Sequence, residues 1–172
     1  MTYRETMVGL ADYAAQGRFF WEEPTTPVAD RNSLAFGLIG GEPDFVCTVE
    51  QGTYVVGRRE RGVLTPPLLT TNSLYEVDRY LSFAIGNSVR YRNGVPRLAL
   101  DLRAPLGVGM HGGYLVSRAP GTVTIAWNTA SGDRYVSFLT DADASRFLLY
   151  SSFSVEDIRA AFLSETGSPL QG

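Results

Sequence analysis

The sequence contains no lysine, one histidine and one cysteine, and these shortages exclude several kinds of site. A phosphate loop of the Gly-Lys-Ser/Thr type is excluded, because its lysine and hydroxyl are needed for phosphate and magnesium. Cys47 has no second cysteine to pair with, so no internal disulfide can form. Catalytic zinc usually takes three protein ligands, which one histidine and one cysteine do not supply. We therefore expect no metal and no cofactor.

Long apolar runs and an excess of positive charge are also missing. No apolar run approaches the ~20 residues of a spanning helix, and residues 1–16 lack the basic and apolar regions of a signal peptide. The net charge is −3 and the pI about 5.2, whereas nucleic-acid binders usually carry a strong basic face. We expect a cytoplasmic protein that binds neither nucleic acid nor membrane, and the acidic balance favours a basic protein partner.

Four helices are expected where a capping residue precedes apolar residues at helical spacing. Their capping residues are Thr2, Ser73, Thr140 and Ser154. Three of them, Thr2, Ser73 and Ser154, are expected to form capping boxes with the acidic residue three positions later. The central helix, which begins after Ser73, is expected to end at Gly86-Asn87.

Strands are expected where β-branched and aromatic residues lie between turn-forming residues. These segments are residues 18–23, 34–40, 44–51, 53–60, 113–119, 122–129 and 133–140. Residues 61–72 contain Pro66-Pro67 and are expected to form a loop. The order of elements predicts one domain over residues 1–172, of the α+β class. It would have a mainly antiparallel sheet of about six or seven strands, an N-terminal helix, a central helix and two C-terminal helices.

Residues 103–115, RAPLGVGMHGGYL, are rich in glycine and include the single histidine. Residues 107–112 spell the G-x-G-x-x-G string of dinucleotide sites, but strand-like residues follow in place of the helix that would hold a pyrophosphate. His111 is the only histidine available as a catalytic base. Two interpretations stay open: a loop presented to another protein, and a small-ligand or enzyme site in which a distant carboxylate orients His111.

The remaining candidate residues have structural explanations. Asp141, Asp143 and Asp157 lie in first helical turns, where a carboxylate caps backbone N–H groups and complements the helix dipole. Glu76 and Asp78 are expected on the solvated face of the central helix. Cys47, within the strand-like run DFVCTVE, is expected to be a buried apolar residue.

Two longer segments resemble a known family. They are SLYEVDRYLSFAIGNSVR (73–90) and LLYSSFSVEDIRAAFLSETGSPL (148–170), with TYVVGRRE before the first and Arg103-Ala-Pro105 after it. Their order and spacing over roughly residues 50 to 170 are similar to those of the bacterial immunity-protein family that includes the antitoxin of the tuberculosis necrotizing toxin.

This resemblance implies a cytoplasmic protein without catalytic activity. It would bind a secreted toxin domain made by the same cell and block the toxin's active site; the toxin of the family member just named hydrolyses NAD. We expect a free monomer that forms a one-to-one complex. The residues expected to contact the toxin are Met110, His111, Arg58, Arg59 and Trp21. A secretion chaperone that holds the toxin without inhibiting it is an alternative, as is the small-ligand or enzyme site at His111.

Overall fold

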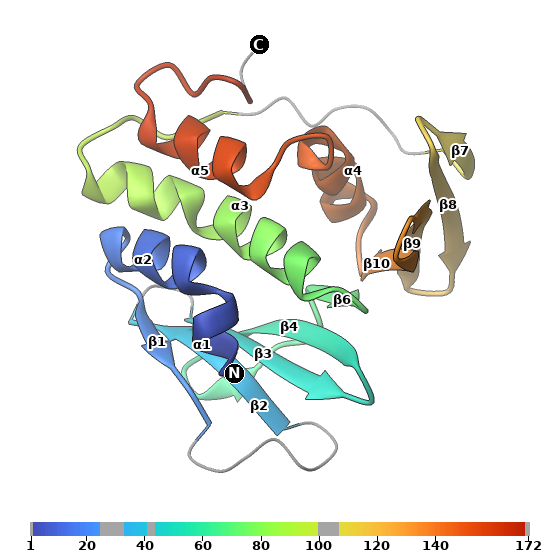
Figure 1. Ribbon diagram of the computed structural model, residues 1–172, viewed down its shortest axis with the longest axis horizontal. Coiled ribbons are helices and arrows are strands. Elements are labelled where there is room, and N and C mark those ends of the chain that lie inside the picture. The colour runs from blue at the N-terminus through green and yellow to red at the C-terminus, as the bar shows by residue number, and fades with distance from the viewer. Residues whose placement is uncertain (1, 25–32, 41–43, 100–106, 171–172) are drawn as a thin grey trace.

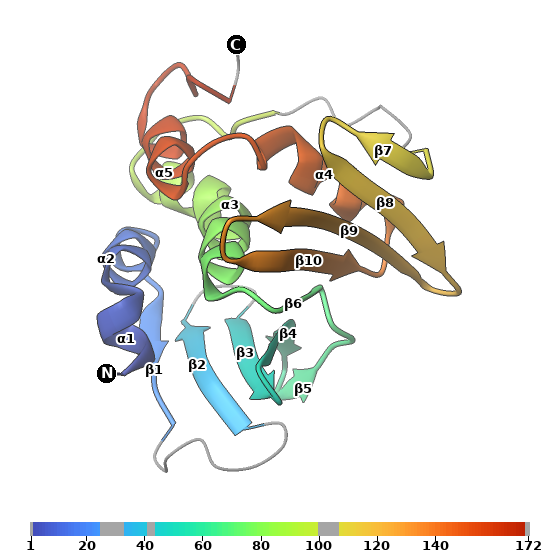
Figure 2. The ribbon, with the colours of Figure 1, turned by 45° about the vertical axis from the view of Figure 1, so that its right-hand side comes forward.

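One continuous antiparallel sheet forms the framework of the protein, and the helices gather on one of its faces (Figures 1 and 2). The computed structural model describes residues 2–24, 33–40, 44–99 and 107–170. Its helices are α1 (Tyr3–Thr6), α2 (Val8–Gln16), α3 (Leu74–Arg92), α4 (Asp141–Tyr150) and α5 (Val155–Leu163). Its strands are β1 (Phe20–Glu22), β2 (Ser33–Ile39), β3 (Asp44–Glu50), β4 (Thr53–Glu60), β5 (Val63–Leu64), β6 (Leu69–Thr71), β7 (Gly109–His111), β8 (Tyr114–Ala119), β9 (Thr122–Thr129) and β10 (Gly132–Phe138). The predicted α+β class is confirmed.

The strand order is β1-β2-β3-β4-β6-β10-β9-β8-β7, and β5 pairs with β4 beside this path. Thr71 of β6 lies opposite Tyr54 of β4 on one side and opposite Val136 of β10 on the other. This three-residue strand therefore joins the N-terminal and C-terminal halves of the sheet.

The described residues contain ten strands, more than the six or seven expected. The additional strands β5, β6 and β7 have two or three residues each, too few to show an alternating pattern. Consequently the prediction of a loop over residues 61–72 was wrong in part, since only Pro66-Pro67 and their neighbours separate β5 from β6.

Helix α3 does not end at Gly86-Asn87 as predicted but continues to Arg92, with Asn93 as its C-cap. Gly86 is instead buried under α5, where a Cβ would overlap the ring of Phe162. A glycine that looked like a helix terminator thus allows two helices to pack closely. The Ser73 side chain also makes no capping hydrogen bond, so the capping box predicted there is absent.

The other predicted caps are confirmed. Thr2 and Ser154 form complete capping boxes, and the Thr140 hydroxyl accepts a hydrogen bond from the Asp143 N–H. The N-terminal helix is nevertheless divided at Met7, whose backbone leaves the helical conformation (φ −117°, ψ 31°) while its side chain is buried. Burial of Met7 in the core is consistent with this break.

The core lies between the helices and the inner face of the sheet. Cys47 is buried there, as predicted. Two carboxylates expected on the solvated face of α3 are instead enclosed: Glu76 is buried and Asp78 is half-buried. Each is paired with an arginine, Arg79 for Glu76 and Arg159 for Asp78, which compensates for the cost of burying a charge. No helix in the described ranges is long and apolar enough to cross a membrane.

Candidate functional site

Four polar and aromatic side chains form a row across the last four strands of the sheet. His111 of β7 lies opposite Tyr114 of β8, and Trp127 of β9 lies opposite Arg134 of β10. Leu115 pairs with Ala126, which places Tyr114 beside Trp127, and their rings meet edge to face with centroids 5.3 Å apart. Directly paired residues of antiparallel strands point to the same face. We call His111, Tyr114, Trp127 and Arg134 the cross-strand row.

The first two turns of α3 face this row and complete a hollow. Tyr75 and Arg79 are four residues apart on the helix, so their side chains lie on one face, and the Arg79 guanidinium is 4.8 Å from the centre of the Tyr75 ring. The resulting recess has a volume of about 330 Å³. It is lined by Ser73, Tyr75, Glu76, Arg79, Tyr114, Trp127, Thr129, Ser131, Arg134 and Ser151. We call it the Arg79 hollow.

A buried ion pair forms the floor of the Arg79 hollow. Arg79 Nη1 donates to both carboxylate oxygens of Glu76, at 3.1 and 3.0 Å. Burial raises the pKa of Glu76, while the Arg79 and Arg134 charges act in the opposite direction. Arg79 Nε is buried and, among the described residues, has no hydrogen-bond partner. One donor of this guanidinium is therefore left unsatisfied beneath the hollow, although buried polar groups are usually paired.

Trp127 is held in place from two sides. Its ring contacts Tyr114 of the row and lies 5.9 Å from the core ring of Phe147 on α4. Across the hairpin, the Arg134 Nη2 donates to the Ser131 hydroxyl at 3.2 Å. Trp127 and Arg134 thus have neighbours that orient them before any partner binds, which lowers the entropic cost of binding.

Residues 107–115 of the glycine-rich segment form a hairpin, whereas the sequence predicted a loop; residues 103–106, with Arg103-Ala-Pro105, lie outside the described residues. Gly112 and Gly113 connect β7 to β8 with φ values of 55° and 90°. A two-residue hairpin turn of type I′ has positive φ at both central positions, which glycine adopts without strain. The glycines therefore build a turn, and His111 comes to the edge of the sheet because of it.

The two residues predicted in this segment point to opposite faces. His111 is half-buried in the cross-strand row, and its Nε2 lies 2.8 Å from the Gly107 carbonyl oxygen. Met110 is on the other face, opposite Leu115, and its side chain is 68% exposed. Among the described residues, the hydrogen-bond partner of the His111 ring is this carbonyl oxygen. A catalytic histidine would instead need a carboxylate to orient its ring.

The other three predicted contact residues lie elsewhere. Arg58 points from β4 to the inner face and lines a second cavity. Its neighbour Arg59 is on the outer face, with ion pairs to Glu22 and Asp44 at 3.5 Å each. Trp21 belongs to β1, at the opposite edge of the sheet from β7, and stacks on the core ring of Phe36 at 4.5 Å. The structure therefore does not place these residues together with His111.

Sequence reasoning missed most of the Arg79 hollow. Tyr75, which is 47% exposed, was not among the predicted contact residues, and neither were Arg79 and Arg134. A partial signal for one pair was present, because Trp127 and Arg134 belong to predicted strands that are joined by the turn-forming residues ASGD (130–133). Nothing in the sequence indicated that the cross-strand row lies beside α3.

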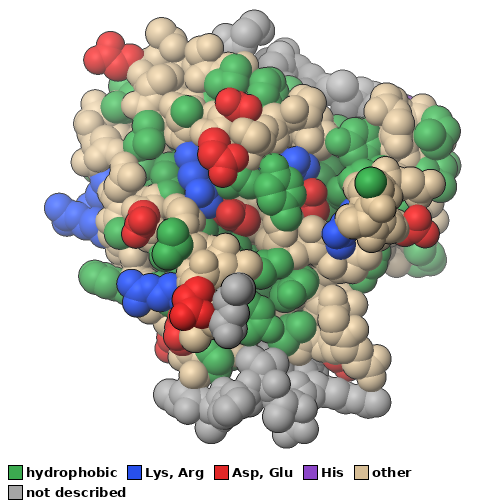
Figure 3. Space-filling model, viewed as in Figure 1, with side chains coloured by type: hydrophobic (Ala, Val, Ile, Leu, Met, Phe, Trp, Pro, Cys, Tyr) green, Lys and Arg blue, Asp and Glu red, His purple; other side chains and the backbone are tan. Residues whose placement is uncertain are grey.

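The surrounding surface is mixed in charge. On the face shown in Figure 3, arginine and acidic side chains lie close together among hydrophobic ones over the helical layer. The described ranges contain no group of three or more His, Cys, Asp or Glu residues arranged to hold a metal ion. The arrangement around the hollow offers aromatic surface and guanidinium donors, which are the features of a binding site.

Comparisons with known proteins give one family and one solved structure. The family model for immunity protein 61 matches residues 15–170. The structure of Rv3902c from M. tuberculosis is similar, with a TM-score of 0.66, 21% sequence identity, and coverage of 94% of this chain and 91% of that chain. At this identity the likeness concerns the fold. No curated protein matches the chain.

Proposed function

We propose that this chain, which belongs to the immunity protein 61 family, neutralises a cognate toxin in the cytoplasm of the producing cell by binding it and covering its active site. The observation that carries this proposal is the family match over residues 15–170. That match spans both segments on which the sequence resemblance rested, and the resemblance is confirmed. An immunity protein acts through a protein partner, and we propose a one-to-one complex.

The proposed interface is centred on the Arg79 hollow and the cross-strand row. Binding energy in protein interfaces is concentrated in a few Trp, Tyr and Arg residues that fill or line well-packed recesses. Trp127, Tyr75 and Arg134 are residues of this kind around one recess. His111 extends the surface to the sheet edge, and Met110 would contact the toxin from the other side of β7.

The affinity must be high, because an immunity protein has to hold its toxin at low cellular concentration. A Kd of about 1 nM or below corresponds to about −12 kcal/mol. An interface of about 1,600 Å² in total is the usual size for such complexes.

Co-expression with the adjacent gene tests the proposal. The C-terminal domain of a large secreted protein encoded next to this chain is expressed with and without it, and growth and co-purification are measured. We expect restored growth and a one-to-one complex. Toxicity that this chain does not relieve, with no complex formed, would contradict the proposal.

Variants of the hollow then map the interface. Trp127→Ala and Arg134→Ala should each weaken the complex at least about 30-fold, the effect of a hot-spot residue worth 2 kcal/mol. Arg92→Ala is the matched control, since Arg92 is exposed and lies about 20 Å from Arg79 along the axis of α3 at 1.5 Å per residue. Unchanged affinity in both hollow variants would move the interface elsewhere.

The residues selected from the sequence are tested in the same assay. The double variant Met110→Ala/His111→Ala should weaken the complex without changing the melting temperature, because neither side chain is in the core. An unchanged Kd would remove these two residues from the interface. Arg58, Arg59 and Trp21 stay predictions, each examined by its own alanine variant.

The toxin's chemistry is a finer part of the proposal. We propose that the toxin is an NAD glycohydrolase, the activity implied by the family resemblance described above. The purified toxin domain is incubated with NAD, and the amount remaining is measured with and without this chain. Loss of NAD that this chain prevents would support the assignment, whereas a toxin that leaves NAD intact would refute it.

The same assay separates inhibition from chaperoning. A toxin that stays fully active within the complex would favour the secretion chaperone. The enzyme hypothesis requires a carboxylate that orients the His111 ring. Among the described residues, however, the ring's hydrogen-bond partner is the Gly107 carbonyl oxygen. The family and the hollow both favour toxin binding over these alternatives.

A further inference from the structure

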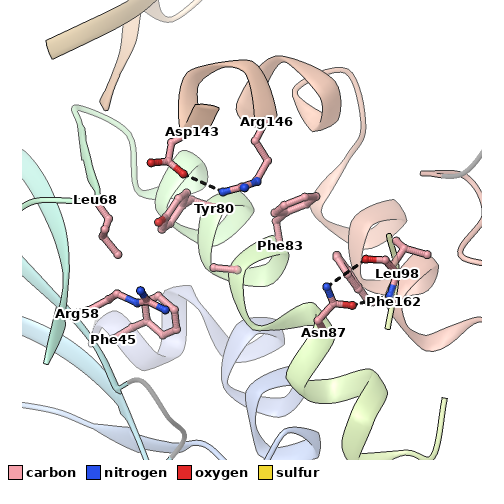
Figure 4. Close-up of a pocket in the computed structure, with 11 residues that line it drawn as sticks. Phe45, Arg58, Leu68, Tyr80, Phe83, Asn87, Leu98, Asp143, Arg146 and Phe162 are labelled. Carbon is pink, nitrogen blue, oxygen red and sulfur yellow. Dashed lines mark hydrogen bonds and ion pairs between the residues drawn. The ribbon is translucent and has the colours of Figure 1, made fainter. Parts of the chain in front are cut away.

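A second cavity of about 480 Å³ lies between β4, α3 and α4 (Figure 4). It shares no lining residue with the Arg79 hollow. Its volume is within the range of about 300 to 1,000 Å³ that is typical of small-molecule sites. We call it the Arg58 cavity.

Much of the wall of the Arg58 cavity is apolar. Phe45, Leu68, Phe83 and Phe162 contribute to its walls. Phe83 stacks on Tyr150 with centroids 4.3 Å apart and meets Phe162 edge to face at 5.5 Å. Rings held by such contacts form a preformed surface for the apolar body of a ligand.

The lining also carries two arginines, which come from different elements and reach the cavity from different sides. Arg146 of α4 is fixed by Asp143, whose Oδ1 accepts from its Nη1 at 2.8 Å. Arg58 is opposite Phe45 in the sheet, so both point to the inner face. Its recorded ion-pair partner, Glu60, is 3.9 Å away, and within the described part of the chain its guanidinium donates no hydrogen bond. The lining thus has two cations for one anion, and no residue in the described ranges accepts a hydrogen bond from the Arg58 guanidinium.

The charged groups of the lining affect the pKa of one tyrosine of the same cavity, Tyr80. Burial and the Asp143 charge raise the pKa of Tyr80, while Arg58 and Arg146 act to lower it. Tyr80 itself lines the cavity. Figure 4 shows Arg58 and the Asp143–Arg146 pair reaching the cavity from different sides, with Tyr80 near that pair.

We propose that the Arg58 cavity binds a small ligand with one anionic head and an apolar, ring-sized body. The head, a carboxylate or a phosphate, would accept hydrogen bonds from Arg58 and Arg146, and the body would pack on Phe45 and Phe83. Charge-assisted hydrogen bonds from guanidinium groups suit both kinds of head. The inference does not rest on the proposed toxin binding, because it concerns a separate cavity.

Calorimetric titration of the purified protein tests this inference with four probes: phenyl phosphate, benzoate, inorganic phosphate and benzyl alcohol. We expect at least one of the two anionic aromatic probes to bind with a Kd of about 1 mM or below. Whichever of them binds more tightly identifies the head. Inorganic phosphate and benzyl alcohol should bind at least ten times more weakly, since each lacks either the body or the charge. Equal binding of benzyl alcohol, or no binding of either anionic aromatic probe, would overturn the proposal.

Single substitutions inside and outside the cavity show where the ligand binds. Arg58→Gln should raise the Kd at least tenfold, whereas Arg59→Gln should leave it within about twofold, because Arg59 is the next residue but points to the opposite face of β4. Ala84→Leu should abolish binding by filling the cavity while keeping both arginines. Circular dichroism checks the fold of each variant. Unchanged affinity in the folded Arg58→Gln or Ala84→Leu protein would place the ligand elsewhere.

Discussion

Gly86 of α3 and Phe162 of α5 pack against each other so closely that any Cβ at position 86 would overlap the phenylalanine ring. This contact sets the distance between the two helices. The two residues are 76 positions apart in the sequence, so their contact connects the central helix to the C-terminal helix.

Gly86→Ala should therefore destabilise the protein, although alanine is the better helix former. Overpacking of a core typically costs about 1–3 kcal/mol, and we expect about 2 kcal/mol here. Gly9→Ala is the comparison, because Gly9 is also helical but its added Cβ would meet the end of a side chain, the Arg159 guanidinium, whose contacts with Asp78 and Ser82 must shift; we expect a smaller cost there. Urea unfolding measures both. Equal stability of the Gly86→Ala protein and the wild type would show that α5 can shift to accommodate the methyl group.

Arg90 is a buried cation that stabilises the C-terminal end of α5. It is 2% exposed and donates to the carbonyl oxygens of Pro96, Ala161, Ser164 and Glu165 at distances from 2.5 to 3.2 Å. Cations are favourable where helix carbonyls are left without intrahelical partners.

Arg90→Met should reduce the free energy of unfolding by about 3 kcal/mol or more, since several buried carbonyls lose their donor. The same change at the exposed Arg92 should cost less than about 0.5 kcal/mol. Thermal and urea unfolding of the two variants give the comparison. Similar unfolding free energies of the Arg90→Met and Arg92→Met proteins would mean that water replaces the Arg90 guanidinium without a loss of stability.

Two serines that look alike in the sequence should behave differently. The Ser154 hydroxyl accepts a hydrogen bond from the Asp157 N–H at 3.1 Å, whereas the Ser73 side chain makes no capping bond. Ser154→Ala should therefore cost about 1 kcal/mol. Ser73→Ala should change stability by less than about 0.5 kcal/mol. If the two variants lose the same stability in urea titration, the cap assignment is wrong.

The single thiol should be inert in the folded protein. Cys47 is 1% exposed, and burial raises the pKa of its thiol far above the ordinary range. The thiolate is the reactive form, so both access and ionisation are suppressed. A disulfide reagent should label Cys47 only after unfolding, while a Ser152→Cys variant should label at its exposed new thiol in the native state. Rapid labelling of the native wild type would show that β3 opens locally.

What the sequence by itself determined is mostly local. The absence of lysine and the single cysteine removed whole classes of site before any folding was considered. Alternation identified the long strands, and side-chain caps identified the starts of α1, α4 and α5, because these signals act between residues a few positions apart.

The tertiary structure decided everything that depends on distant partners. The sequence predicts that Gly86 ends a helix, because its contact with Phe162 depends on the fold. It also predicts that Glu76 is solvated, because burial of Glu76 with Arg79 depends on the fold as well. The cross-strand row exists because strand register puts His111, Tyr114, Trp127 and Arg134 on one face, and the packing of α3 turns that row into a hollow. Register and helix packing are set by the whole core, which is why the sequence revealed the family while the site required the fold.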